Sequence, residues 1–105
     1  MKKSKYDHLI RSSDKPLVLI DFYADWCGPC KALAPSLSKI SKEFSDKLSV
    51  YKINIDKNQG LAGSLNVRSI PSLFLYRDGK VIWKQVGGMS YSQLKNELSV
   101  FTNRT

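Results

Sequence analysis

The chain has 105 residues, of which 42% are hydrophobic and 25% charged, and its formal net charge is +8 at pH 7. This length suits a single domain, 1–105, and the composition is too apolar for a disordered chain. No apolar run is long enough to span a bilayer, and two cysteines are too few for a scaffold held by several disulfides.

The apolar pattern predicts helices that alternate with strands. Tyr6, Leu9 and Ile10 have the i, i+3, i+4 spacing of a short first helix. The segment 17–24 is almost entirely apolar, which predicts a strand covered on both faces. The expected elements are, in chain order, a short helix ending near 12–13, strands over 17–24 and 48–55 separated by a helix over 29–44, a short helix over 61–65, strands over 72–77 and 81–86, and a last helix that follows Ser90.

Local signals define the turns of the second half. Asp78-Gly79 is a two-residue hairpin signal, so the strands on either side of it are expected to be antiparallel. Ser90 and Gln93 have the spacing of a capping box at the start of the last helix. The predicted fold is α/β, in the order α-β-α-β-α-β-β-α, with helices on both faces of a central mixed sheet.

The basic residues are spread along the chain, and their densest group is Lys2, Lys3 and Lys5. No basic run is interleaved with aromatic residues, so we expect a solvated basic surface that binds neither nucleic acid nor membrane. No apolar stretch of signal-peptide length follows these lysines, which predicts a cytoplasmic protein. An extracytoplasmic location is expected only if Met1 replaces a removed signal peptide.

Cys27 and Cys30 lie at the junction between a predicted strand and a predicted helix. A thiolate is the nucleophile in thiol–disulfide exchange, and a helix N-terminus stabilises negative charge, so the pKa of Cys27 should be lowered. Cys30, one turn further along, should lie beneath an accessible Cys27 and be able to form a disulfide with it. The alternative is a structural zinc site, but His8 is the only histidine, so four ligands would require two chains. We expect no metal.

Asp21 is a carboxylate on the apolar strand, on the same face as Leu17, Leu19 and Tyr23. Burial disfavours its charged form and should raise its pKa, so it can exchange a proton with a neighbouring thiol such as that of Cys30. The alternative is a structural aspartate that accepts a hydrogen bond from the backbone.

Trp26-Cys27-Gly28-Pro29-Cys30-Lys31 is identical to the active-site hexapeptide of the thioredoxin family. Asp21-Phe22-Tyr23-Ala24 precedes it, and Asn54-Ile55-Asp56, Ile70-Pro71-Ser72 and Val86-Gly87-Gly88 follow in the family's order and approximate spacing. The chain therefore resembles thioredoxins over roughly 6–103, and the resemblance implies a thioredoxin fold with four or five strands. The family's N-terminal edge strand is in doubt, because only five residues precede Tyr6. Tyr23 is a further departure, since relatives more often have Trp there.

The resemblance also implies roles for the residues around the cysteines. Asp21 would be the buried acid, and Lys52 would be the lysine that approaches it, although a solvent-facing Lys52 is the alternative. The Ile70–Pro71 bond would be cis, where an ordinary trans proline is the alternative. The substrate-binding residues would be Trp26, Ile70, Pro71, Gly87 and Gly88, and the active-site loop would contain Trp26, Gly28 and Pro29.

The predicted function is reduction of protein disulfides. Cys27 would attack the substrate disulfide, and Cys30 would resolve the mixed disulfide. The resemblance implies a monomer that binds no cofactor and is recycled by thioredoxin reductase, in which flavin and NADPH reside. The alternatives are an extracytoplasmic thioredoxin-like redox relay or oxidant, and a non-catalytic binding subunit. Gly28-Pro29 adds no cation beside the thiolate, whereas oxidants of this fold typically carry His there.

Overall fold

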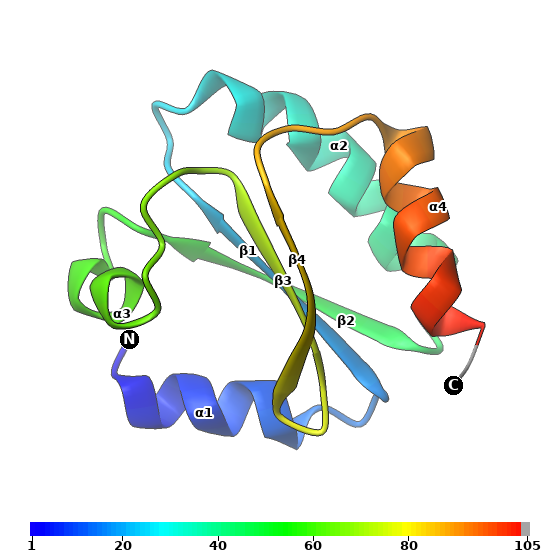
Figure 1. Ribbon diagram of the computed structural model, residues 1–105, viewed down its shortest axis with the longest axis horizontal. Coiled ribbons are helices and arrows are strands. Elements are labelled where there is room, and N and C mark those ends of the chain that lie inside the picture. The colour runs from blue at the N-terminus through cyan, green and yellow to red at the C-terminus, as the bar shows by residue number, and fades with distance from the viewer. Residues whose placement is uncertain (104–105) are drawn as a thin grey trace.

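The computed structural model describes residues 1–103, and its elements follow the predicted order (Figure 1). The elements are α1 (Lys3–Ser12), β1 (Leu17–Tyr23), α2 (Gly28–Glu43), β2 (Leu48–Asn54), α3 (Gln59–Ser64), β3 (Ser72–Arg77), β4 (Lys80–Val86) and α4 (Tyr91–Thr102). None of the helices described is long and apolar enough to cross a membrane.

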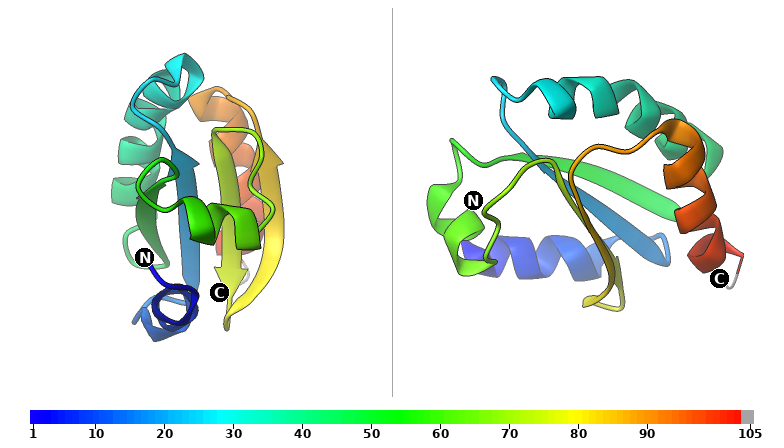
Figure 2. Two further views of the ribbon diagram at one scale, coloured as in Figure 1. Left: turned by 90° about the vertical axis from the view of Figure 1, so that its left-hand side faces the viewer. Right: turned by 45° about the horizontal axis from the view of Figure 1, so that its top comes forward.

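The strands form one mixed sheet in the order β2-β1-β3-β4. β1 is parallel to β2, whereas β3 is antiparallel to both β1 and β4. Helices α2 and α4 cover one face of the sheet, and α1 and α3 cover the other (Figures 1 and 2). The predicted α/β architecture with helices on both faces is therefore confirmed.

The sheet has four strands over residues 1–103, so the doubtful N-terminal edge strand is not formed there. Helix α1 begins at Lys3, three residues before Tyr6, and the Tyr6 amide donates to the Lys2 carbonyl at 3.1 Å. Tyr6 and Ile10 lie one turn apart and are both buried against the sheet. The residues that could have formed an edge strand are thus used to start the helix.

Strand β1 contributes to two separate apolar layers because its side chains alternate between the faces. Leu17 and Leu19 pack in the cluster beneath α2 and α4, and Ile20 and Phe22 pack in the cluster beneath α1 and α3. Leu19 and Ile20 are fully buried. Burial of such a side chain contributes about 1.5–3 kcal/mol, so β1 holds both helical layers to the sheet.

The turn chemistry of the second half also agrees with the sequence. Asp78 and Gly79 both have positive φ, at 54° and 76°, as a type I′ hairpin turn requires. The capping box is formed at α4, where the Ser90 hydroxyl accepts from the Gln93 amide and the Gln93 side chain accepts from the Ser90 amide. The turn brings Arg77 opposite Lys80 at the start of the β3–β4 pairing, and the capping box fixes the start of α4.

A buried tyrosine pair fastens α1 to the sheet. The hydroxyls of Tyr6 and Tyr76 are 2.8 Å apart, and the two rings meet edge to face. Burial raises the pKa of both hydroxyls, so both stay neutral and one donates to the other. Phe22 and Phe74 complete the aromatic group around them.

We predict that Tyr6→Phe lowers the free energy of unfolding by about 1–3 kcal/mol, because it leaves the Tyr76 hydroxyl buried without its partner. The double variant Tyr6→Phe/Tyr76→Phe should lose less than the sum of the two single losses, since it leaves no orphan hydroxyl. Urea unfolding of the four proteins measures the coupling. Strictly additive losses would contradict this assignment.

Candidate active site

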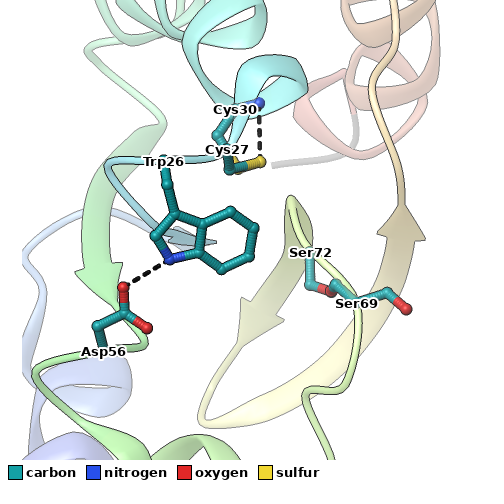
Figure 3. Close-up of a disulfide and its surroundings, with 6 residues drawn as sticks. All are labelled: Trp26, Cys27, Cys30, Asp56, Ser69 and Ser72. Carbon is teal, nitrogen blue, oxygen red and sulfur yellow. Dashed lines mark hydrogen bonds between the residues drawn. A yellow bond between two sulfur atoms is a disulfide. The ribbon is translucent and has the colours of Figure 1, made fainter.

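A disulfide joins Cys27 and Cys30 where the chain passes from β1 into α2 (Figure 3). The Cα atoms of the two cysteines are 5.2 Å apart. Cys27 is the N-cap of α2, and its sulfur accepts a hydrogen bond from the Cys30 amide at 3.2 Å. Gly28 and Pro29 form the first two helical positions, where proline loses no helical hydrogen bond. The sulfur of Cys27 therefore lies where the helix N-terminus favours negative charge.

The disulfide is enclosed, whereas the neighbouring Trp26 side chain is exposed. Trp26 is 67% exposed, whereas Cys27 and Cys30 are 4% and 5% exposed. The expected difference in access between the cysteines is thus not present in this disulfide form, in which both sulfurs are enclosed in one small apolar cluster. The other members of that cluster are Ala24, Tyr23, Ile55 and Ile70.

Asp56 is a site residue that the sequence reasoning did not single out. Its carboxylate accepts a hydrogen bond from the Trp26 indole at 2.8 Å (Figure 3). The Asn54 side chain accepts from the Asp56 and Lys57 amides and so fixes the turn after β2. The signal was present in Asn54-Ile55-Asp56, but nothing in that segment showed which side chain Asp56 would meet.

Two further loops meet the disulfide. The Ile70–Pro71 peptide bond is cis, and Ile70 packs against the cysteine cluster. The Gly87 amide donates to the Pro71 carbonyl at 2.8 Å, with a φ of +93° that favours glycine. A Cβ on Gly88 would lie 3.8 Å from the Cβ of Pro29, so this loop passes close to the start of α2. Residues predicted from four distant motifs are thus brought together here.

Asp21 lies in the layer between the sheet and α2. It is 1% exposed, and its Oδ1 has no hydrogen-bond partner within residues 1–103. Burial raises the pKa of Asp21 to about 6, against a smaller lowering by the Lys52 ammonium group. The carboxyl group can therefore both accept and release a proton near neutral pH.

The sequence left two alternatives for Lys52, a lysine close to Asp21 and a solvent-facing lysine, and the structure shows features of both. It is exposed, yet it lies opposite Asp21 in the β1–β2 register, and its charge acts on that carboxyl group. Its ammonium group lies 4.6 Å from the centre of the Tyr23 ring. Tyr23, Lys52 and Cys30 line a hollow of about 370 Å³ that opens beside the disulfide. The Tyr23 ring thus contacts Lys52, the residue opposite the buried Asp21.

The raised pKa of Asp21 predicts a pH-dependent stability. Its folded-state pKa, about 6, lies above the ordinary 3.8, so its contribution to stability is present below pH 3.8 and is lost as pH rises through 6. Asp21→Asn in the disulfide form should therefore stabilise the protein more at pH 7.5 than at pH 4, by up to about 3 kcal/mol. Urea unfolding of both proteins at the two pH values measures this, and an equal effect at both would contradict it.

A four-stranded mixed sheet that carries a C-x-x-C disulfide at a helix N-terminus defines a thiol–disulfide oxidoreductase. No group of three or more potential metal ligands (His, Cys, Asp or Glu) occurs among residues 1–103. The comparisons with known proteins agree with this class, and the Thioredoxin family model matches residues 1–100. The chain belongs to the thioredoxin family and is a protein disulfide oxidoreductase with the redox-active pair Cys27–Cys30.

Individual relatives match over nearly the whole chain. Thioredoxin 1 of Chlorobaculum tepidum is 44% identical over 92 residues, which are 88% of this chain and 90% of the relative. The thioredoxin of Haemophilus influenzae is 43% identical over 91 residues, or 87% of this chain and 84% of the relative. The solved structure of a mutant thioredoxin from Halobacterium salinarum superimposes with a TM-score of 0.83 at 36% identity, covering 97% of this chain and 87% of that one.

Proposed function

We propose that the protein reduces disulfides in other proteins with Cys27 as the nucleophile and Cys30 as the resolving thiol. The observation that carries this assignment is the hydrogen bond from the Cys30 amide to the Cys27 sulfur at the start of α2. In the reduced protein, that amide and the helix N-terminus stabilise a thiolate on Cys27.

The reaction proceeds in two exchanges. The Cys27 thiolate attacks one sulfur of the substrate disulfide, forms a mixed disulfide and releases the other substrate sulfur as a thiolate. The Cys30 thiol then gives its proton to the Asp21 carboxylate and attacks the Cys27 sulfur. The second substrate thiolate leaves. The two electrons gained by the substrate come from the thiols of Cys27 and Cys30, which are oxidised to the new Cys27–Cys30 disulfide.

Asp21 suits this proton transfer because it is buried and near its pKa at neutral pH, and Lys52 keeps that pKa from rising further. Trp26, Ile70, Pro71, Gly87 and Gly88 would bind the substrate. A substrate strand can pair with the Ile70 backbone, and the two glycines leave room for its chain.

The disulfide form must be reduced again after each cycle. We assign this step to thioredoxin reductase, whose flavin and NADPH would supply the electrons, since this chain is itself proposed to bind no cofactor. We further propose that residues 1–105 form one domain that acts as a monomer in the cytoplasm, without nucleic-acid or membrane binding. The bacterial relatives named above support this setting.

Insulin reduction with dithiothreitol tests the catalytic assignment. We predict that Cys27→Ser abolishes the acceleration and that Cys30→Ser accumulates a mixed disulfide, because only the resolving thiol is lost. The mixed disulfide is detected by mass spectrometry. A wild-type rate equal to that of Cys27→Ser would instead support a non-catalytic binding subunit. Equilibration with glutathione then distinguishes a reductase from an oxidant by the reduction potential.

We predict that Asp21→Asn slows the resolving exchange by roughly 10²-fold at pH 7, because amide nitrogen and oxygen cannot take the Cys30 proton. The attack by Cys27, measured separately in the Cys30→Ser background, should change much less. Stopped-flow fluorescence follows both steps, with Trp83 replaced by Phe in every variant so that the signal comes from Trp26, the chain neighbour of Cys27. Equal slowing of both steps, or unchanged resolution, would show that Asp21 does not transfer this proton.

A further inference from the structure

A second hollow, of about 260 Å³, lies beside the cis-proline loop. We call it the basic hollow because, among its lining residues, Arg68 and Lys84 are charged and none is acidic. Its other walls include the hydroxyl-bearing Ser69 and Ser72 and the apolar Val86, which is 59% exposed. It is separate from the hollow beside Cys30, and neither of its cations takes part in the chemistry proposed above.

The two cations are not neutralised by this chain. Arg68 and Lys84 are both exposed, and neither forms an ion pair with an acidic residue among those that the structure describes. The Lys84 ammonium group is held 4.7 Å from the centre of the Phe74 ring. This contact leaves its charge available and limits its freedom, which reduces the entropy lost on binding an anion.

The basic hollow adjoins the active site. Ser69 and Ser72 flank Ile70–Pro71, and Ile70 packs against the cysteines. Figure 3 shows the loop of Ser69 and Ser72 facing the disulfide across from Trp26. On the other side, Val86 precedes Gly87, whose amide is bonded to the Pro71 carbonyl. An extended chain that binds at the disulfide and pairs with the Ile70 backbone would therefore reach this hollow within a few residues.

We propose that the basic hollow binds an acidic side chain, Asp or Glu, of the substrate protein, and that Arg68 and Lys84 determine substrate specificity. This inference rests on the proposed function, since it requires a substrate disulfide at Cys27. An extended substrate advances about 3.3 Å per residue, so an acidic residue two to four positions from the reacting cysteine lies about 7–13 Å away, within reach of the hollow. The exposed Val86 offers an apolar contact for the substrate residue next to this acidic residue.

A carboxylate is favoured as the occupant by charge and by size. The chain has a net charge of +8, so acidic segments are attracted and basic ones are repelled during encounter. A volume of about 260 Å³ suits one or two side chains and not a helix. The hydroxyl group of Ser69 can donate a hydrogen bond to a carboxylate, in addition to the two cations.

The test uses symmetrical disulfides of a short peptide with one cysteine, made with Glu, Gln or Lys at each position two to four residues before or after that cysteine. The rate constant for oxidation of the reduced protein by each peptide is measured at low and high salt. We expect Glu to be preferred over Gln about two- to fivefold at one or more positions, with a smaller preference at high salt. Lys should be the slowest.

Matched variants distinguish an effect of the basic hollow from an effect of the overall charge. Arg68→Gln/Lys84→Gln should lose the preference for Glu over Gln, and Arg68→Lys/Lys84→Arg should keep it. Lys5→Gln/Lys80→Gln removes the same charge from α1 and from the hairpin end of β4, away from the active site, and should also keep it. The Glu-to-Gln ratio within each variant corrects for any change in folded fraction.

The inference is overturned if wild type oxidises at equal rates with Glu and Gln peptides at every position. It is also overturned if Arg68→Gln/Lys84→Gln keeps the preference, or if Lys5→Gln/Lys80→Gln loses it equally, because the effect would then arise from long-range charge. Failure of the proposed function has a different signature, since every peptide would then oxidise the reduced protein no faster than it oxidises dithiothreitol.

Discussion

The structure depends on the burial of β1 on both faces. Its residues alternate between two apolar layers, so one strand holds α2 and α4 on one side and α1 and α3 on the other. Where β1 ends, the chain leaves the sheet and Cys27 caps α2 after a short turn. The position of the redox pair is therefore set by the most constrained strand of the fold, which keeps the sulfur at the helix N-terminus.

The same burial sets the raised pKa of Asp21. An apolar residue at this position would stabilise the layer beneath α2, whereas a carboxyl group is forced toward its neutral form. Lys52 offsets only part of this effect, because it reaches the carboxyl group from the exposed edge strand β2. The fold thus gives up some stability at neutral pH to keep a carboxyl group in this layer, and the rest of the strand compensates through apolar packing.

Much of this arrangement could be predicted from the sequence because it depends on local patterns. The apolar run of β1, the Asp78-Gly79 turn and the Ser90 cap each determine their structure over a few residues. Contacts between distant segments could not be predicted in this way. The bond between Trp26 and Asp56 depends on how two loops meet, and the bond between Tyr6 and Tyr76 depends on how α1 packs on the sheet. Both follow from tertiary packing, which spacing does not encode.

The residues proposed for the reaction and those proposed for substrate recognition lie on different elements. The two cysteines and Asp21, the proposed proton acceptor, come from β1 and the start of α2, where packing is tight and substitution is costly. Arg68 and Lys84 instead lie on an exposed loop and on an edge strand, where a side chain can change with little effect on the core. Under the proposed role of these two residues, their charge alters which chains approach the disulfide without changing the helix N-terminus or the buried acid. A family that shares one reaction can therefore vary its partners through such surface positions.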